Sequence, residues 1–256
     1  MTILYCHCAY ADVVPEETRR AVRAALAAAD GHVEVVADLC ERAAARDPLL
    51  AELASGDGPL HVVACYPRAV RWLFEFAGAS LPGSATVHNM RTDDAATILT
   101  RLGLAAHTLS PGGRKPGEGG NGFPEKSPDD WIAWYPVIDE DRCVSCGQCM
   151  EFCLFGAYER DADKRIRVAN PAACKLNCPA CARVCPKSAI IFPKFPDGGP
   201  IAGTDGTLAA DAEDGMRGDL ARLGKEDVYD VLRQRAARAR EAARAKFPDR
   251  KDPAAE

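Results

Sequence analysis

Cysteine spacing constrains this chain more than any other feature of its sequence. Eight of its twelve cysteines fall between residues 143 and 185, in two blocks of four. A thiolate is a soft ligand that favours zinc, copper(I) and iron–sulfur clusters over hard cations. Cysteines this close together in sequence therefore predict short loops wrapped around metal centres. The blocks consist of Cys143, Cys146, Cys149 and Cys153, and of Cys174, Cys178, Cys181 and Cys185, the last followed by Pro186.

The two blocks resemble the C-x2-C-x2-C-x3-C-P runs of bacterial-type dicluster 2[4Fe-4S] ferredoxins. In that family three cysteines of one run bind a cluster, and the fourth binds the cluster of the other run. Two departures stand out: three residues separate Cys174 from Cys178, where two are usual, and Leu154 replaces the usual proline. The resemblance implies two ligand sets, Cys143, Cys146, Cys149 and Cys185 for cluster 1, and Cys174, Cys178, Cys181 and Cys153 for cluster 2.

A pair of four-thiolate zinc sites is the alternative for these cysteines. Zinc motifs usually come as separated C-x2-C knuckles and not as four cysteines in one short run, so iron–sulfur clusters are favoured. Short strands are expected near Val137 and over residues 157–160, 166–168 and 188–192. The blocks repeat after about 31 residues, from Cys143 to Cys174, which favours two halves related by duplication.

Residues 1–107 predict an α/β domain. Apolar runs at 3–6, 33–36, 60–65 and 85–90 read as strands, and helical patterns at 15–29, 39–46, 48–54, 68–77 and 92–102 alternate with them. Alternation of this kind predicts a parallel sheet covered by helices, with right-handed crossovers. The expected fold class is therefore this parallel α/β domain joined to a small α+β, ferredoxin-like dicluster domain and followed by a C-terminal helix.

Composition suggests the other boundaries. Residues 108–128 are a Gly/Pro-rich linker, 129–196 the dicluster domain, and 197–256 a flexible segment with a basic helix from 226 to about 247. That helix could dock on an acidic partner, although a solvated helix with a frayed end is favoured. Gly117, Gly119 and Gly122 match the dinucleotide-binding G-x-G-x-x-G pattern, but no strand precedes them and no helix follows. We therefore discard that match.

The other four cysteines are Cys6, Cys8, Cys40 and Cys65. Each lies at or just after the end of a predicted parallel strand, so all four are expected at the same edge of the sheet, where such folds bind ligands. Single free cysteines are ordinarily small buried hydrophobes. For the set of four, a third [4Fe-4S] cluster is favoured, with zinc or a redox-active Cys6/Cys8 pair as alternatives. His7 is expected to be a solvent-facing spacer, with a role as a ligand as the alternative, and His32, His61, His88 and His107 are expected to be structural.

The same residues carry a second resemblance. The segments Tyr5-Cys6-His7-Cys8, Asp38-Leu39-Cys40 and Val62-Val-Ala-Cys-Tyr-Pro-Arg68 are similar to the amino-terminal module of HdrA, the flavin-binding subunit of heterodisulfide reductase. The likeness covers about the first 80 residues and implies an α/β domain that holds a [4Fe-4S] cluster through Cys6, Cys8, Cys40 and Cys65. Tyr66 stands where that family has serine, and nothing in the chain corresponds to its flavin-binding domain.

Bulk properties limit the partners. The formal net charge is −5, clusters would add further negative charge, and basic and aromatic residues are not interleaved, so nucleic acid is not expected. No apolar run approaches the roughly 18–20 residues needed to cross a bilayer. The first residues lack the basic start and cleavage site of a signal peptide. We expect a cytoplasmic protein, in which twelve cysteines indicate metal ligation and not disulfides.

These features predict an iron–sulfur electron-transfer protein. It would relay single electrons through two [4Fe-4S] clusters, or three with the N-terminal site, to or from a larger partner oxidoreductase complex. The alternative is an oxidoreductase subunit whose N-terminal cysteine site reduces a disulfide or a small substrate. No Ser-His-Asp set, open metal site or phosphate cradle is recognisable, so no catalytic residue is assigned and an electron carrier is favoured over a stand-alone enzyme.

Overall fold

The computed structural model describes residues 1–29, 31–104 and 130–208. Met1–Leu208 belong to one unit by their internal contacts. The predicted linker at 108–128, the discarded glycine pattern inside it, His107, and the predicted C-terminal helix at 226–247 lie outside the described residues. The predicted domain boundaries stay predictions.

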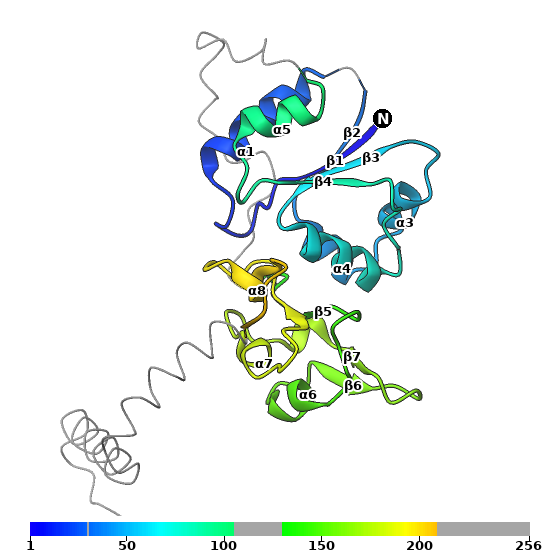
Figure 1. The fold of residues 1–256 in the computed structure, drawn as a ribbon, viewed down its shortest axis with the longest axis vertical. Coiled ribbons are helices and arrows are strands. Elements are labelled where there is room, and N and C mark those ends of the chain that lie inside the picture. Colours follow the sequence, from blue (N-terminus) through cyan, green and yellow to red (C-terminus); the bar gives the residue numbers. More distant parts are fainter. Residues whose placement is uncertain (30, 105–129, 209–256) are drawn as a thin grey trace, which may run out of the picture. The chain divides into compact units, whose positions relative to one another are not determined.

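A four-stranded parallel sheet organises the N-terminal half (Figure 1). Its strand order is β2-β1-β3-β4, and neighbouring strands run parallel. Thr2 at the start of β1 lies opposite His32 of β2 and Leu60 of β3. The predicted parallel α/β architecture is therefore confirmed. Because β1 lies in the middle, the chain leaves β1 and β3 in opposite directions, which makes their carboxyl ends the topological switch of the sheet. The strands are β1 (Thr2–Cys6), β2 (His32–Val36), β3 (Leu60–Ala64) and β4 (Thr86–Asn89).

Helices cover both faces of this sheet, α1 and α5 on one face and α2, α3 and α4 on the other (Figure 1). Aspartates cap three of them: Asp38, Asp47 and Asp94 accept backbone N–H groups of the first turns of α2, α3 and α5. Gly78, with φ of 84°, ends α4 in the left-handed conformation that glycine adopts without strain. The helices are α1 (Glu16–Ala27), α2 (Leu39–Ala44), α3 (Pro48–Ala54), α4 (Pro67–Ala77) and α5 (Ala95–Arg101).

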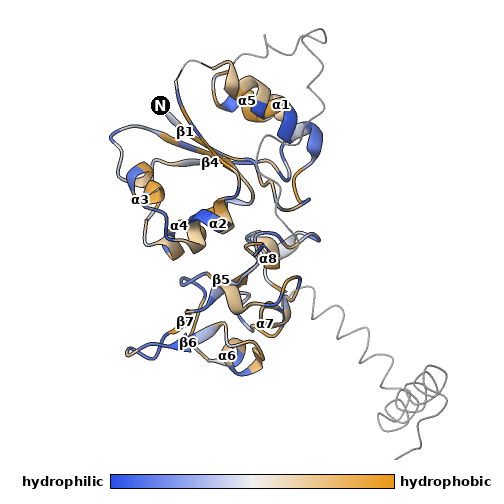
Figure 2. Cartoon of the chain, turned by 180° about the vertical axis from the view of Figure 1, so that it is seen from behind, coloured by the Kyte–Doolittle hydropathy of each residue, from blue (hydrophilic) through white to orange (hydrophobic). Residues whose placement is uncertain are grey.

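Apolar residues fill the layer between sheet and helices. In Figure 2 the middle of the sheet has the orange of hydrophobic residues, whereas α1 carries blue, hydrophilic ones. Leu4 and Val62, from β1 and β3, are fully buried, as are Leu73 and Phe74 of α4. Continuous apolar strands are typical of a parallel sheet that is covered on both faces.

Residues 130–208 form a smaller module with two antiparallel strand pairs. Strand β5 (Val137–Ile138) pairs antiparallel with β8 (Ile190–Ile191), and β6 (Tyr158–Arg160) pairs antiparallel with β7 (Ile166–Val168). All four strands fall in the segments that the sequence predicts. Short helices fill the connections: α6 (Gln148–Phe152), η2 (Pro171–Ala173), α7 (Ala180–Arg183) and α8 (Gly199–Ala202).

The N-terminal half and this module share buried residues. Tyr135, Val137 and Ile191 belong to the same hydrophobic cluster as the sheet. Arg68 of α4 is buried and donates from Nε to Asp139 Oδ2 at 2.5 Å and from its other nitrogens to the carbonyl oxygens of Ser188, Pro200 and Thr204. Arg68 thus satisfies four acceptors of the module with one side chain, which fixes how α4 meets it.

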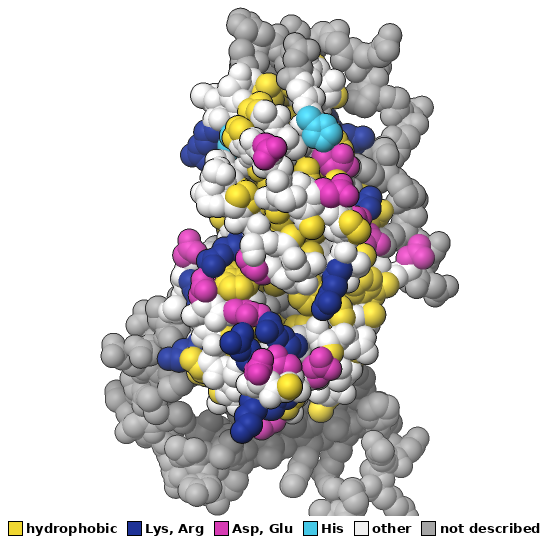
Figure 3. All heavy atoms as spheres, turned by 90° about the vertical axis from the view of Figure 1, so that its right-hand side faces the viewer, with side chains coloured by type: hydrophobic (Ala, Val, Ile, Leu, Met, Phe, Trp, Pro, Cys, Tyr) yellow, Lys and Arg dark blue, Asp and Glu magenta, His cyan; other side chains and the backbone are white. Residues whose placement is uncertain are grey.

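The surface of the module is electrostatically mixed. In the lower part of Figure 3, basic and acidic side chains lie among one another. Arg167 pairs with both Glu140 and Asp161, and Arg71 pairs with Asp141. None of the helices in the described ranges is long and apolar enough to span a bilayer.

Candidate metal centres

The first predicted ligand set surrounds a cavity. Cys143, Cys146, Cys149 and Cys185 all line it, together with backbone and side chains of the first cysteine block and of residues 186–190. The cavity among these thiols is small, about 20 Å³. Cys185 thus lies with the first block, although 32 residues separate it from Cys153. The structure therefore brings together the four residues that the ferredoxin resemblance groups into cluster 1.

Backbone geometry explains how a short loop can present these thiols inward. Ser145, just before Cys146, and Gly147, just after it, have φ of 52° and 90°. The equivalent residue of the second block, Asn177 before Cys178, has φ of 61°. Left-handed residues reverse the chain tightly, and asparagine tolerates that conformation better than most residues. The extra residue between Cys174 and Cys178 leaves this turn in place.

The second set consists of thiols that raise one another's pKa. Its members are Cys153, Cys174, Cys178 and Cys181. The pKa of Cys174 is raised to about 12, chiefly by burial and further by the neighbouring thiols of Cys181, Cys153 and Cys178. Burial likewise raises the pKa of Cys181 to about 11, with Cys153 and Cys178 adding to the shift. The last cysteine of the first block therefore lies among the thiols of the second block.

The two sets also adjoin each other. Burial raises the pKa of Cys149 to about 12, and the next contribution comes from Cys181 of the other set, ahead of Cys143 and Cys185. Crowded thiolates repel, so such a site is stable in its ionised form only with a bound cation to neutralise it.

Two observations test whether an iron–sulfur cluster fits these residues. The buried hydroxyl of Tyr158 lies beside Cys181, whose sulfur accepts a hydrogen bond from it more strongly once ionised. Ala189 N donates to Cys185 Sγ at 3.3 Å, a contact of the kind that stabilises ligating sulfur. Donors directed at ligand sulfurs, together with inward thiols, fit a cluster with four thiolate ligands.

A single metal ion fits less well. In residues 1–104 and 130–208 apart from residue 30, no three histidine, cysteine, aspartate or glutamate side chains are placed to hold one ion. A tetrahedral zinc site needs its four thiolates about 2.3 Å from one centre. The thiolates of a cubane each bind a different iron atom and stand further apart. Among the described residues, then, no single-ion site is preformed.

The four N-terminal cysteines lie at the carboxyl edge of the sheet. Cys6 ends β1, Cys8 follows in a left-handed turn with φ of 52°, Cys40 lies in the first turn of α2, and Cys65 follows β3. This is the edge that the sequence predicts for all four, and β1 and β3 form its switch point. Leu39 N donates to Cys6 Sγ at 3.3 Å, which ties the start of α2 to the end of β1.

Burial dominates the chemistry of these thiols. It raises the pKa of Cys6 to about 12 and of Cys65 to about 11, and it raises those of Cys8 and Cys40 well above their usual value. Asp38 adds to the shift at all four cysteines. A redox-active thiol requires the opposite, a lowered pKa and access to solvent. The arrangement therefore disfavours a reactive Cys6/Cys8 pair.

Charged and polar groups that sequence reasoning did not single out surround this site. Lys194, from the segment after β8, forms a buried ion pair with Asp38, which caps α2. Tyr135 Oη donates to the carbonyl oxygen of Cys40 at 2.7 Å. Asp38 carried a local signal, because an aspartate two residues before Cys40 is a typical N-cap. Lys194 and Tyr135 carried none.

The histidines have structural surroundings where they are described. The expectation that His7 faces solvent is wrong: it is buried, with Nδ1 3.1 Å from Tyr5 Oη, and burial lowers its pKa to about 4. His61 and His88 stack, with Nδ1 and Nε2 3.0 Å apart. His32, at the start of β2, is exposed.

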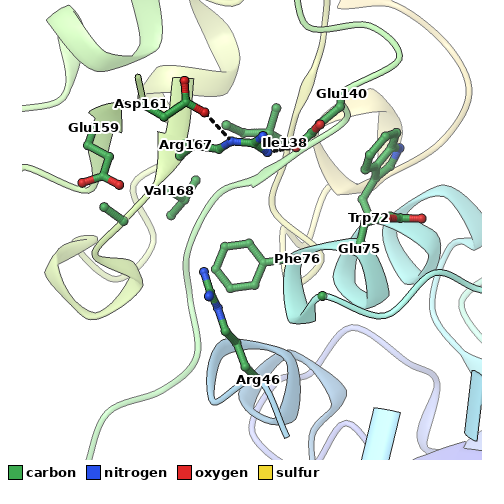
Figure 4. Close-up of a pocket in the computed structure, with 12 residues that line it drawn as sticks. Arg46, Trp72, Glu75, Phe76, Ile138, Glu140, Glu159, Asp161, Arg167 and Val168 are labelled. Carbon is green, nitrogen blue, oxygen red and sulfur yellow. Dashed lines mark hydrogen bonds and ion pairs between the residues drawn. The ribbon is translucent and has the colours of Figure 1, made fainter. Parts of the chain in front are cut away.

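A separate hollow of about 360 Å³ lies where α4 meets β7 (Figure 4). Phe76 and Val168 form its apolar wall, and Arg46 extends toward it. Arg167 in its wall is held by Asp161 and Glu140. No cysteine lines this hollow, so it is distinct from the candidate metal centres.

Comparison with known proteins places the cysteine-rich module in a class. Residues 135–158, which carry β5 and the whole first cysteine block, match the family of 4Fe-4S binding domains. The chain therefore contains a ferredoxin-type iron–sulfur domain. It is also similar to an uncharacterised ferredoxin of the archaeon Methanocaldococcus jannaschii, with 44% identity over 49 residues. That match covers 19% of this chain and 33% of the archaeal protein, so only about a third of the relative's length is shared.

Proposed function

We propose that this protein relays single electrons through [4Fe-4S] clusters between partner oxidoreductases. The observation that carries the proposal is the exchange of the fourth cysteines: Cys185 lies with the first block and Cys153 with the second. The match of residues 135–158 to 4Fe-4S binding domains and the similarity to an archaeal ferredoxin support the same role. A [4Fe-4S] cluster supplies a centre that gains and loses one electron with little change in geometry.

The residues of the module would hold two such clusters. Cys143, Cys146, Cys149 and Cys185 would ligate the first, and Cys153, Cys174, Cys178 and Cys181 the second. Loop residues in left-handed conformation turn the thiols inward, and the N–H of Ala189 favours the ionised form of Cys185. Because the two sets adjoin at Cys149 and Cys181, an electron would have a short path between them.

A third cluster would be held by Cys6, Cys8, Cys40 and Cys65. Cys174, of the second set, packs against the hydrophobic cluster that contains Cys6, Cys8 and Cys40 as well as against that of the module. The resemblance to the amino-terminal module of HdrA supports the same ligand set.

Burial of the N-terminal thiols speaks against the alternative function. A site that reduces a disulfide must expose a thiolate to the substrate sulfur. Cys6, Cys8 and Cys40 are each less than 9% exposed, and all four thiols have raised pKa values. We therefore place electron relay ahead of disulfide reduction.

Exposed apolar side chains around the cysteine blocks support a protein partner. Seven large hydrophobic side chains are exposed in the described residues, and five of them belong to the two block regions. Leu154 is 90% exposed and directly follows Cys153. Apolar groups that border a cluster are suited to exclude water when a partner docks close enough for electron transfer. The five are Val144, Phe152, Leu154, Phe155 and Leu176.

Iron and acid-labile sulfide, counted per chain after anaerobic reconstitution, test the proposal. We expect about twelve irons, four for each of three cubanes. Cys65→Ser and Cys146→Ser should each remove roughly four, because each breaks a different ligand set. Ser55→Ala, an exposed position at the end of α3, serves as the control and should keep all of them. About eight irons with no loss in Cys65→Ser would confine the clusters to the module, and zinc without sulfide would refute the relay altogether.

A further inference from the structure

The ion pair between Lys194 and Asp38 is almost completely buried. Their side chains are 3% and 1% exposed. Lysine and aspartate are hardly ever buried to this extent unless they are paired. The two residues are 156 positions apart, one in the cysteine-rich module and the other at the start of α2, so the pair joins the two described parts of the chain.

Asp38 connects this pair directly to the N-terminal cysteine site. While Oδ2 accepts the ammonium of Lys194, Oδ1 accepts the backbone N–H of Cys40 at 2.9 Å and that of Glu41 at 3.3 Å. One carboxylate therefore separates the ammonium from the backbone of a predicted cluster ligand. Cys6 also contacts the start of α2, since the N–H of Leu39, the residue after Asp38, donates to its sulfur.

Surrounding contacts hold Lys194 in this position. Arg91, which follows β4, donates to the carbonyl oxygens of Pro193 at 3.2 Å, Phe195 at 2.9 Å and Pro196 at 3.0 Å. These carbonyls flank Lys194 on both sides. The guanidinium of Arg91 also lies over the ring of Tyr66, next to Cys65, 4.8 Å from its centroid. The lysine is thus clamped by a residue of the half that contains the cysteine site.

Stability alone does not account for such a pair. Two charges lose their hydration on burial, and replacing a buried ion pair by apolar residues is often neutral or stabilising. A cluster held by four thiolates is itself anionic, and nearby charges tune its potential. An ammonium and a carboxylate fixed beside such a site therefore have an effect that apolar residues would not have.

We propose that Lys194 and Asp38, two opposite charges fixed beside the N-terminal site, set its reduction potential. This inference rests on the proposed third cluster. One-electron reduction adds a negative charge to the site, which the ammonium favours and the carboxylate opposes. Removing the ammonium should make reduction harder, and removing the carboxylate charge should make it easier.

The test is a redox titration of the reconstituted chain with dithionite and mediators, followed by electron paramagnetic resonance. The signal of the N-terminal site is the one that Cys65→Ser lacks. We expect Lys194→Met to shift its reduction equilibrium at least tenfold toward the oxidised form, about 59 mV for a one-electron couple. Asp38→Asn, which keeps an oxygen to cap α2, should shift it in the opposite direction, and the double variant should lie between them.

Matched variants separate an electrostatic role from a loosened structure. Lys194→Arg keeps the charge and should stay near the unaltered potential. Lys164→Met removes an exposed lysine of the same module and should leave the signal in place. If Lys194→Met does not fold, Asp38→Asn and Lys194→Arg still decide the question. Shifts of equal sign in Lys194→Met and Asp38→Asn, or no shift with about twelve irons bound, would overturn the inference alone. About eight irons in the unaltered chain would instead overturn the third cluster, and this inference with it.

Discussion

The raised pKa values of Cys6 and Cys65, about 12 and about 11, describe thiols that are neutral in the metal-free protein. Ligation requires the thiolate, so cluster binding must release these protons and becomes stronger as the pH rises. The metal-free chain behaves in the opposite way. In the unfolded chain a cysteine loses its proton near pH 8.5. Because the folded pKa values are higher, the unfolded state gives up protons first.

We therefore expect the metal-free protein to lose stability above about pH 8.5, and to keep its full thiol contribution below that value. The loss should continue toward pH 11–12, where the folded thiols of Cys6 and Cys65 ionise. Urea unfolding of the metal-free chain between pH 7 and 10 measures this slope. Cys6→Ala, which removes one such thiol, should flatten it; an unchanged slope in that variant would show that other groups are responsible.

Arg68 offers a second prediction at this scale. Its side chain is 5% exposed and its partner Asp139 is 4% exposed. Arg68→Met leaves buried Asp139 with only the longer ion pair to Arg142, at 3.3 Å, and removes the donor to three carbonyl oxygens, which costs about 3–5 kcal/mol of unfolding free energy. Arg71→Met on the same helix breaks an ion pair whose side chains are 52% and 63% exposed, and should cost less than about 1 kcal/mol. Equal losses in urea denaturation would contradict the role given to Arg68.

At the scale of elements, local patterns determined most of what forms. The strands β1 to β4 and the helices α1 to α5 fall within or close to the predicted segments, because apolar runs, aspartate caps, Pro48, Pro67 and Gly78 are all local signals. Contacts between segments far apart in sequence were not predictable. The pairing of Asp38 with Lys194 and of Arg68 with Asp139 depends on how the two parts pack, and no local pattern encodes that packing.

The candidate site divides in the same way. The spacing of the two blocks and their resemblance to dicluster ferredoxins implied the two module sets, and the predicted strand ends grouped the four N-terminal cysteines, since both signals are local in sequence. The residues that surround those sets, such as Tyr135 at Cys40 and Tyr158 at Cys181, have no spacing rule and became visible only in the structure.

Loop geometry around the first block gives a prediction at the element scale. Gly147 has φ of 90°, and a Cβ there would stand 2.7 Å from Nη2 of Arg160. Gly147→Ala should therefore cost about 1–2 kcal/mol through backbone strain and should impair loading of the first ligand set. Gly83, with open space around it and no left-handed φ, is the matched control. Iron counts and urea denaturation of both variants check this; full loading of Gly147→Ala would show that the turn is not needed.

At the scale of the whole molecule, the exposed apolar side chains predict where a partner docks. Leu154→Glu places a charge at the most exposed of them, beside Cys153. We expect at least a tenfold lower rate of electron transfer to the physiological partner, measured by stopped-flow absorbance, with the iron content unchanged. Val35→Glu, at a 41% exposed position of β2 in the other half, is the control. Equal losses in both variants would contradict docking at the cysteine blocks.

The unequal exposure of the thiols has a consequence for handling the protein in air. Cys146 is exposed, whereas Cys6, Cys8 and Cys40 lie beneath other residues of the chain. Dioxygen and chelators attack the centre that they reach first, so if the proposed clusters form, bleaching should proceed in stages, with the one at Cys146 early and the one in the N-terminal half last. Samples purified without strict exclusion of oxygen would then retain mainly their most deeply enclosed iron.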